Sequence, residues 1–215
     1  HALDSRINNI PVSDFSDFTI YSFQAIKTLT TGDGGILAIK DADLVKKAKR
    51  LRWFGIERED KQKGIWENDL TEIGYKYQLN DIAASIGLAG ILEFDKISKL
   101  RCLLFQAYVS NLTNPKVRIL GSHLPNYYSF VPWLMTVIIE NPLSREAVMN
   151  HLRKMKIESA QVHYRNDKYS IFNTGIEDEF KNMDFLENRY LVLPLHTKVS
   201  INQVNYICSV INDIS

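Results

Sequence analysis

The sequence has little of what a metal centre, a disulfide framework or a nucleic-acid surface requires. Its two cysteines, Cys102 and Cys208, provide neither a disulfide framework nor the spacing of a zinc site. Its five histidines include no HxH or HxxxH pair, so we expect no metal site. Lys and Arg (26) almost balance Asp and Glu (25), which gives a net charge of +1. This balance offers no electrostatic reason to expect nucleic acid as a partner.

Long apolar runs and a signal-peptide pattern are also missing. The longest apolar run, within residues 133–139, is far shorter than the roughly 20 residues that span a bilayer. We therefore predict no membrane partner, and two cysteines without a framework spacing fit a reduced, cytoplasmic location. What remains is an ordinary globular composition, 45% hydrophobic and 24% charged, with enough chain for one large core or two small ones.

One segment, residues 18–39, has the residues of a reactive site rather than those of a packed core. A β-forming run leads to a single lysine, Lys27, among small and apolar neighbours, and a Gly-Asp-Gly-Gly turn then leads to a strand over 36–39 that we expect to be buried. A lysine at the rim of a sheet, away from other charges, favours the neutral amine that can attack a carbonyl. Ser22 offers a hydroxyl to a phosphate oxygen. By themselves these features also fit a hairpin with a solvated lysine, because Asp33-Gly34 is an ordinary turn signal.

The whole string, SFxxxKxxxxGxGG, closely resembles the lysine segment of the DegT/DnrJ/EryC1/StrS family of sugar aminotransferases, which use pyridoxal 5'-phosphate. Three more segments resemble the family in the same order: GYKYQLNDIAA at 74–84, VHY at 162–164 and LPLH at 193–196. The resemblance implies an α/β fold, the C-terminal portion of a fold-type I transferase that is similar to aspartate aminotransferase. It also implies a partial large domain followed by a small α/β domain.

The resemblance assigns cofactor roles residue by residue. Lys27 matches the lysine that binds the cofactor aldehyde and moves protons in catalysis, and Ser22 matches a residue that contacts the cofactor phosphate. His1 matches a position near the ring hydroxyl. Lys76 stands where relatives often have Asn, in a loop that reaches the cofactor phosphate of the neighbouring subunit. A lysine there can act as a point-charge phosphate ligand.

The substrate residues implied by the resemblance follow the VHY segment. His163, Tyr164 and Arg165 lie where the small domain of the family faces the substrate, and Arg165 can pair with a carboxylate or a diphosphate. The alternative is a strand end with exposed polar side chains.

The activity that the resemblance implies is transfer of an amino group to a keto group of a nucleotide-linked deoxysugar, for lipopolysaccharide or other surface polysaccharide. Glutamate is the usual amino-acid donor, and the expected assembly is a homodimer that shares site residues across subunits. A sibling branch performs dehydration with His in place of the lysine, and Lys27 argues against that branch.

The first residues bear on whether this chain can act alone. His1-Ala2 resembles the end of the DxxHA segment of the family, whose aspartate bonds the pyridine nitrogen and would lie three residues before His1. We therefore expect the chain to be the C-terminal portion of a longer enzyme and to be inactive by itself. The alternative is a truncated, non-catalytic remnant of such an enzyme.

Local patterns predict the elements that carry these segments. Asp41 and either Asn80 or Asp81 are expected to cap helices, and residues 54–69 are expected to form a long loop. The small residues between 83 and 90 suit either a subunit interface or a packed core. Apolar periodicity then continues beyond residue 100, so we predict a long helix that bridges two domains, 1–98 and 99–215.

The last third is expected to form a compact α/β layer. We predict strands over 133–140, 160–163 and 191–195, a helix that begins after Ser144 with Met155 on its inner side, and a terminal helix. Ser200 and Gln203 are expected to form a capping box at the start of that last helix.

Overall fold

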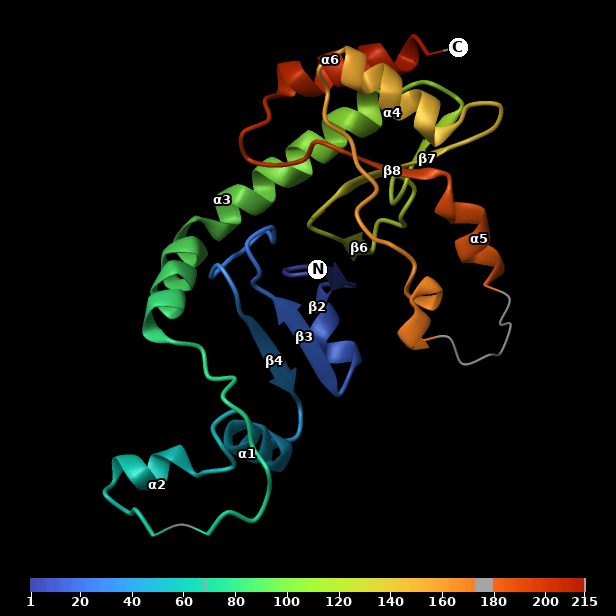
Figure 1. Cartoon of the computed structure of the whole chain (residues 1–215). Helices are drawn as coiled ribbons and strands as arrows, with labels where there is room; N and C mark the ends of the chain where they lie inside the picture. Colours follow the sequence, from blue (N-terminus) through green and yellow to red (C-terminus); the bar gives the residue numbers. More distant parts are fainter. Residues whose placement is uncertain (68, 173–179, 215) are drawn as a thin grey trace. The chain divides into compact units, whose positions relative to one another are not determined.

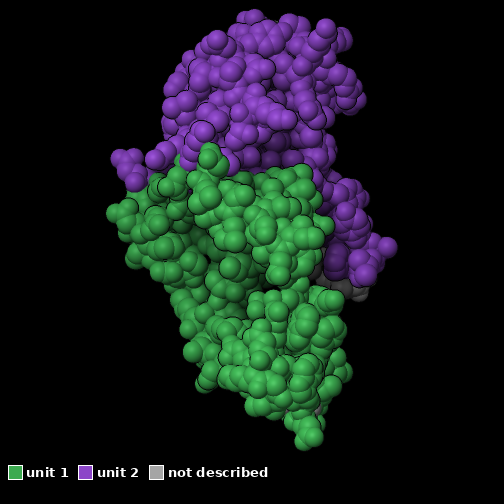
Figure 2. Space-filling view, turned by 90° about the vertical axis from the view of Figure 1, so that its left-hand side faces the viewer, with its two compact units in different colours: residues 1–95, 127–130 green, residues 96–126, 131–215 purple. Residues whose placement is uncertain are grey.

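The computed structural model describes residues 1–67, 69–172 and 180–214. The chain divides into two compact units, which Figure 2 shows in different colours. The first unit contains residues 1–95 and 127–130, and the second contains residues 96–126 and 131–215. The division between 95 and 96 falls within one helix, α3 (Asp81–Asn111), as does the predicted boundary between 98 and 99.

The first unit is built around an antiparallel strand pair, β3 (Phe18–Ser22) and β4 (Gly35–Ile39) (Figure 1). The pairing runs from Phe18 opposite Ile39 to Ser22 opposite Gly35. The expectation that residues 36–39 are buried is wrong, since Ile36 is 52% exposed. The physical reason is that, among the described strands, β4 pairs only with β3, and a two-stranded sheet has too few neighbours to cover its faces.

The other strands of the first unit form a small antiparallel sheet. Its order is β2 (Ile10–Pro11), β1 (Arg6–Ile7) and β6 (Tyr128–Ser129). A single 3-10 turn, Val12–Phe15, then leads to β3.

Helices complete the first unit. Asp41 caps α1 (Ala42–Leu51), because its carboxylate accepts the N–H groups of Asp43 at 2.8 Å and Leu44 at 3.1 Å, which confirms that prediction. The expected loop over 54–69 contains a short helix, α2 (Arg58–Gln62). Asn80, rather than Asp81, caps α3 by accepting the N–H of Ala83 at 2.9 Å.

The second unit contains an antiparallel sheet whose order is β5 (Val117–Ile119), β7 (Met135–Ile139) and β8 (Tyr190–Leu193). Its helices are the second part of α3, then α4 (Arg145–Lys154), α5 (Lys181–Glu187) and α6 (Ile201–Asn212). Two 3-10 turns, Asn166–Lys168 and Ser170–Phe172, lie before α5. Figure 1 shows α4 and α6 side by side.

Alternation along the strands of the second unit gives its sheet two apolar faces. On one face Met135, Val137 and Leu191 are fully buried, and so are Leu104 of α3 and Leu152 of α4. The residues between them, which point to the opposite face, are also largely apolar. The second face is therefore also expected to be covered by other segments of the unit. A groove lies between this face and those segments.

Several local predictions for this unit are confirmed and two are wrong. Ser144 caps α4, and Ser200 forms the complete capping box with Gln203. Met155 is 40% exposed instead of inward, because α4 ends at Lys154. The expected strand over 160–163 is reduced to one bridge between Ala160 and Val192.

Candidate functional site

Lys27 lies in the connection between β3 and β4. Two backbone bonds close the base of this connection: Phe23 donates to the carbonyl of Gly34 at 2.8 Å, and Thr31 donates to the carbonyl of Phe23 at 2.9 Å. At the tip, the N–H of Lys27 donates to the carbonyl of Gln24 at 2.9 Å and forms a turn. The lysine is therefore presented by a closed loop at the end of a strand pair.

Glycines of α3 allow this loop to lie close against the helix. A Cβ atom on Gly90 would lie 2.8 Å from Leu29 Cδ1, and one on Gly87 would lie 2.8 Å from Thr31 Cγ2. Both loop residues are buried, Leu29 with 7% exposure and Thr31 with 5%. The sequence suited either a packed core or a subunit interface for the small residues of α3. At these two positions they serve packing inside the unit.

The amine of Lys27 has an imidazole beside it. Its Nζ lies 2.7 Å from Nε2 of His1, so one nitrogen must donate and the other accept. Partial burial lowers the pKa of Lys27 below its ordinary value, because the ammonium loses hydration that the neutral amine needs less. The structure thus brings together two of the predicted site residues, and the lowered pKa shifts the amine toward its neutral, nucleophilic form.

Ser22 is the last residue of β3 and is half-buried. Its Oγ accepts the N–H of Gln24 at 3.4 Å, a long bond. This arrangement uses the hydroxyl as an acceptor and leaves its O–H for another partner.

Lys76 lies on an exposed segment, where its backbone bridges to Trp53. On either side of it the rings of Tyr75 and Tyr77 are stacked, with centroids 5.1 Å apart and an interplanar angle of 11°. Among the described contacts none joins Lys76 to Lys27, so the structure does not bring these two predicted residues together.

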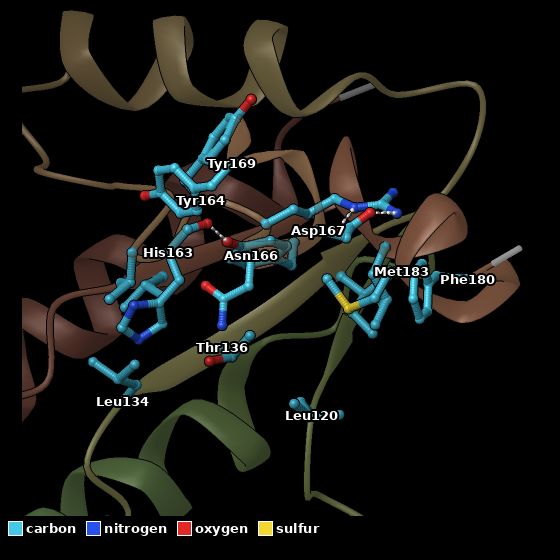
Figure 3. Close-up of a pocket in the computed structure, with 16 residues that line it drawn as sticks. Leu120, Leu134, Thr136, His163, Tyr164, Asn166, Asp167, Tyr169, Phe180 and Met183 are labelled. Atoms are coloured by element: carbon cyan, nitrogen blue, oxygen red, sulfur yellow. Dashed lines mark hydrogen bonds and ion pairs between the residues drawn. The ribbon is translucent and has the colours of Figure 1, made fainter. Parts of the chain in front are cut away.

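His163, Tyr164 and Arg165 line a groove in the second unit (Figure 3). The groove has a volume of about 870 Å³ and lies on the sheet face formed by Thr136, Ile138 and neighbouring residues. Its walls come from the segment 162–169 and from Phe180 to Leu186. Three predicted substrate residues therefore share one cavity.

Arg165 is buried, with 7% exposure, and carboxylates surround it. Its guanidinium donates to both carboxylate oxygens of Asp167, at 3.0 and 2.6 Å, to Asp184 at 2.5 Å and to Glu187 at 3.3 Å. These bonds raise the pKa of Arg165 further and lower the pKa of Asp167. Lys168 also binds Glu187, and this hydrogen bond is the main reason that the pKa of Glu187 is lowered.

His163 and Tyr164 present their rings differently. Tyr164 is 56% exposed and makes an edge contact with Tyr169 at 5.1 Å. The centroid of the His163 ring lies 6.3 Å from that of the Trp133 ring. The backbone carbonyl of His163 accepts a hydrogen bond from the hydroxyl of Tyr190 at 2.5 Å. That hydroxyl bonds the segment to β8. His163 and Tyr164 are both exposed, as the alternative of a strand end with exposed polar side chains also expects.

Sequence reasoning missed several residues of the groove. Asn166, Tyr169, Phe180 and Met183 all line it, and none belongs to a recognised segment. The signal that was present is the run MTVII of β7, whose apolar residues fall on both faces of the strand. Such a strand indicates a sheet that is covered on both sides.

The described residues form no cluster of three or more His, Cys, Asp or Glu side chains suited to a metal ion. Across residues 1–67, 69–172 and 180–214, every helix is too short or too polar to span a bilayer.

Comparison with known proteins finds a family model over nearly the whole chain. The model of the DegT/DnrJ/EryC1/StrS aminotransferase family matches residues 1–212. GDP-perosamine synthase of Escherichia coli O157:H7 is 26% identical over 215 residues, which cover 99% of this chain and 56% of that protein. UDP-4-amino-4,6-dideoxy-N-acetyl-beta-L-altrosamine transaminase of Campylobacter jejuni (serotype O:23/36) is 25% identical, over 96% of this chain and 54% of that protein.

Solved structures agree with this comparison. AtS13 from Actinomadura melliaura superposes with a TM-score of 0.89 at 25% identity, over 100% of this chain and 56% of that one. The PLP form of Spr1654 from Streptococcus pneumoniae gives a TM-score of 0.84 at 26% identity, over 99% and 55%. The chain therefore spans about half the length of the relatives that it matches.

Proposed function

The chain belongs to the DegT/DnrJ/EryC1/StrS aminotransferase family, and on this premise we propose that it carries the catalytic lysine of an aminotransferase for nucleotide-linked sugars. Its fold is the C-terminal portion of a fold-type I transferase that depends on pyridoxal 5'-phosphate, with a mixed α/β architecture. The observation that carries the proposal is the half-buried amine of Lys27, held on a closed loop with the imidazole of His1 at 2.7 Å.

The cofactor is pyridoxal 5'-phosphate. The residues near Lys27 fit it chemically, because an amine with a lowered pKa can hold an aldehyde and the hydroxyl of Ser22 can donate to a phosphate. His1 contributes near the ring hydroxyl, and Lys76 supplies positive charge to the phosphate in the partner subunit's site. When bound, the cofactor supplies the electron sink that lets a proton leave the carbon next to nitrogen.

Lys27 serves as covalent anchor and as acid and base. Its amine takes a proton from the substrate carbon and delivers it to a second carbon, a role that requires the neutral form at the operating pH. His1 supports that form, because a neutral amine can accept from a protonated ring nitrogen at 2.7 Å.

The substrates are an amino-acid donor, glutamate, and a keto group of a nucleotide-linked deoxysugar, in the synthesis of amino sugars for surface polysaccharide such as O-antigen. The names of two relatives, a perosamine synthase and an altrosamine transaminase, support this class. His163 and Tyr164 face the substrate. Arg165, for which we predicted a substrate carboxylate or diphosphate, holds the segment in place instead, since its charge is matched by its own carboxylates.

We place the enzyme in the cytoplasm as a homodimer that shares site residues between subunits. The apolar surface of α3 in the first unit supports such a partner, because Leu88, Ile91 and Leu92, which share one side of the helix, are 66%, 57% and 85% exposed. Clustered exposed apolar side chains are typical of protein interfaces.

Reductive trapping tests the role of Lys27. The complete enzyme, in which this chain is joined to the N-terminal portion that its relatives have, is incubated with pyridoxal 5'-phosphate, reduced with borohydride and mapped by peptide mass spectrometry. We expect the pyridoxyl adduct on the peptide with Lys27, complete loss of that adduct in Lys27→Arg, and no change in Lys40→Arg, which alters an exposed lysine beyond β4. Adducts spread over other lysines, with none on Lys27, would favour the non-catalytic remnant. A panel of keto-sugar nucleotides with glutamate then identifies the substrate.

A further inference from the structure

The groove of the second unit has the size and surface of a site for an uncharged ring. Its volume of about 870 Å³ falls within the roughly 300–1,000 Å³ of small-molecule sites. Its floor is the sheet face of Thr136 and Ile138, and aromatic rings of Tyr164, Tyr169 and Phe180 form part of its walls. These three residues are 56%, 46% and 44% exposed. The rings of Tyr164 and Tyr169 make an edge contact at 5.1 Å, and each residue keeps surface that a ligand can contact.

The charges beside the groove disfavour a phosphate. Among its described lining residues, Arg165 is the only one with a permanent positive charge, and its donors bind Asp167, Asp184 and Glu187. Counting Lys168, which binds Glu187, three carboxylates face two cations there. A diphosphate would therefore meet a net negative cluster with no unengaged guanidinium.

The polar groups of the groove suit the edge of a heterocycle. Figure 3 shows the amide of Asn166 between His163 and Thr136. An amide presents a donor beside an acceptor, and the hydroxyl of Thr136 can do either. Nucleobases present adjacent donors and acceptors of the same kind, and their faces stack on aromatic side chains.

From this chemistry we propose that the groove binds the nucleobase of the nucleotide-linked substrate and leaves its diphosphate outside. The inference rests on the proposed function for the class of substrate. Tyr169 and Tyr164 supply stacking surface, and Asn166 determines which base is accepted.

Binding of free nucleosides to the full chain tests the proposal without cofactor or turnover. Uridine, thymidine and guanosine are titrated by calorimetry, with ribose 5-phosphate as a probe that lacks a base. We expect one of the three nucleosides to bind and ribose 5-phosphate not to bind. The corresponding nucleoside 5'-diphosphate should bind with an affinity within about threefold of that of the nucleoside. Tyr169→Ala should weaken the nucleoside about tenfold and Tyr169→Phe about twofold or less, because the latter keeps the ring.

Tyr206→Ala is the matched control, because Tyr206 lies on α6 with 47% exposure against 46% for Tyr169. It should leave binding unchanged, and Asn166→Ala should reduce the preference among the three nucleosides. The proposal is overturned if no nucleoside binds, if binding requires the diphosphate, or if Tyr169→Ala and Tyr206→Ala behave alike. Lys27→Arg should bind nucleoside normally, so failure of the trapping experiment and failure of this one are separate results.

Discussion

The two units of the chain differ in how completely they bury their apolar side chains. In the second unit Leu104, Met135 and Leu152 have 0% exposure. In the first unit Ile20 of β3 is 75% exposed and Leu92 of α3 is 85% exposed. Both units have apolar strands and helices, so the difference lies in coverage and not in composition. A strand pair with one partner each cannot bury its faces, whereas a sheet with helices against it can.

The difference extends to the residues that carry chemistry. The loop with Lys27 depends on a few contacts, chiefly those of Leu29 and Thr31 with the glycines of α3. The segment with Arg165 is held by a cluster of charge-assisted bonds to α5 and to Asp167. The loop with Lys27 and the segment with Arg165 are therefore supported by different forces, the first by close packing and the second by electrostatics.

The largest expected effect is on the core of the second unit. Leu152→Ala removes a fully buried side chain and should lower the free energy of unfolding by about 2–5 kcal/mol. Ile20→Ala removes a side chain that is 75% exposed and should change it by about 0.5 kcal/mol or less. Urea unfolding at several protein concentrations measures both. If Ile20→Ala lowered the free energy of unfolding as much as Leu152→Ala, and more so at higher protein concentration, self-association would cover β3. The contrast between the units would then not hold for the assembled protein.

An intermediate effect is expected where the lysine loop meets α3. Gly90→Val places side-chain atoms where Leu29 Cδ1 already lies 2.8 Å from a Cβ position, and such overpacking costs about 1–3 kcal/mol. The loop should detach, so limited proteolysis within residues 24–31 should become faster. Ala89→Val is the control, because Ala89 is the exposed neighbour on the same helix. Equal cleavage of both variants would mean that the glycine contact does not hold the loop.

The smallest effect is expected in the carboxylate cluster around Arg165, and it depends on pH. Hydrogen bonds from Arg165 lower the pKa of Asp167, so the folded state binds fewer protons there than the unfolded state. The stabilisation is therefore complete above the ordinary carboxyl pKa of about 4 and is lost as the pH falls through the lowered value.

Asp167→Asn should lower the urea midpoint slightly at pH 7 and leave it unchanged well below pH 4. Asp213→Asn, at the exposed end of α6, is the control variant and is measured over the same pH range. A difference between wild type and Asp167→Asn that persists in acid would show that the cluster acts through packing and not through charge.

Short-range signals predicted much of the fold correctly. Asp41, Ser144 and the Ser200 and Gln203 pair cap helices as their sequence contexts indicate, because a cap bonds to backbone groups only two or three residues away. The prediction of a strand over 160–163 was wrong. A strand needs several consecutive residues paired with a neighbouring strand, and in this segment only Ala160 is paired, with Val192. The sequence singled out His163, Tyr164 and Arg165 of the groove, but not its remaining lining, because those residues come from segments that are far apart in the sequence.

The sequence by itself determined the family and the order of its motifs, and it singled out Lys27 as the lysine that we propose reacts with a carbonyl, since all of these depend on neighbouring residues. Only the tertiary structure decided that His1 lies 2.7 Å from the amine of Lys27 and that Arg165 is occupied by Asp184 and Glu187. Such pairs depend on the path of the whole chain, because the charge and proton state of a side chain respond to whatever lies within a few ångströms in space.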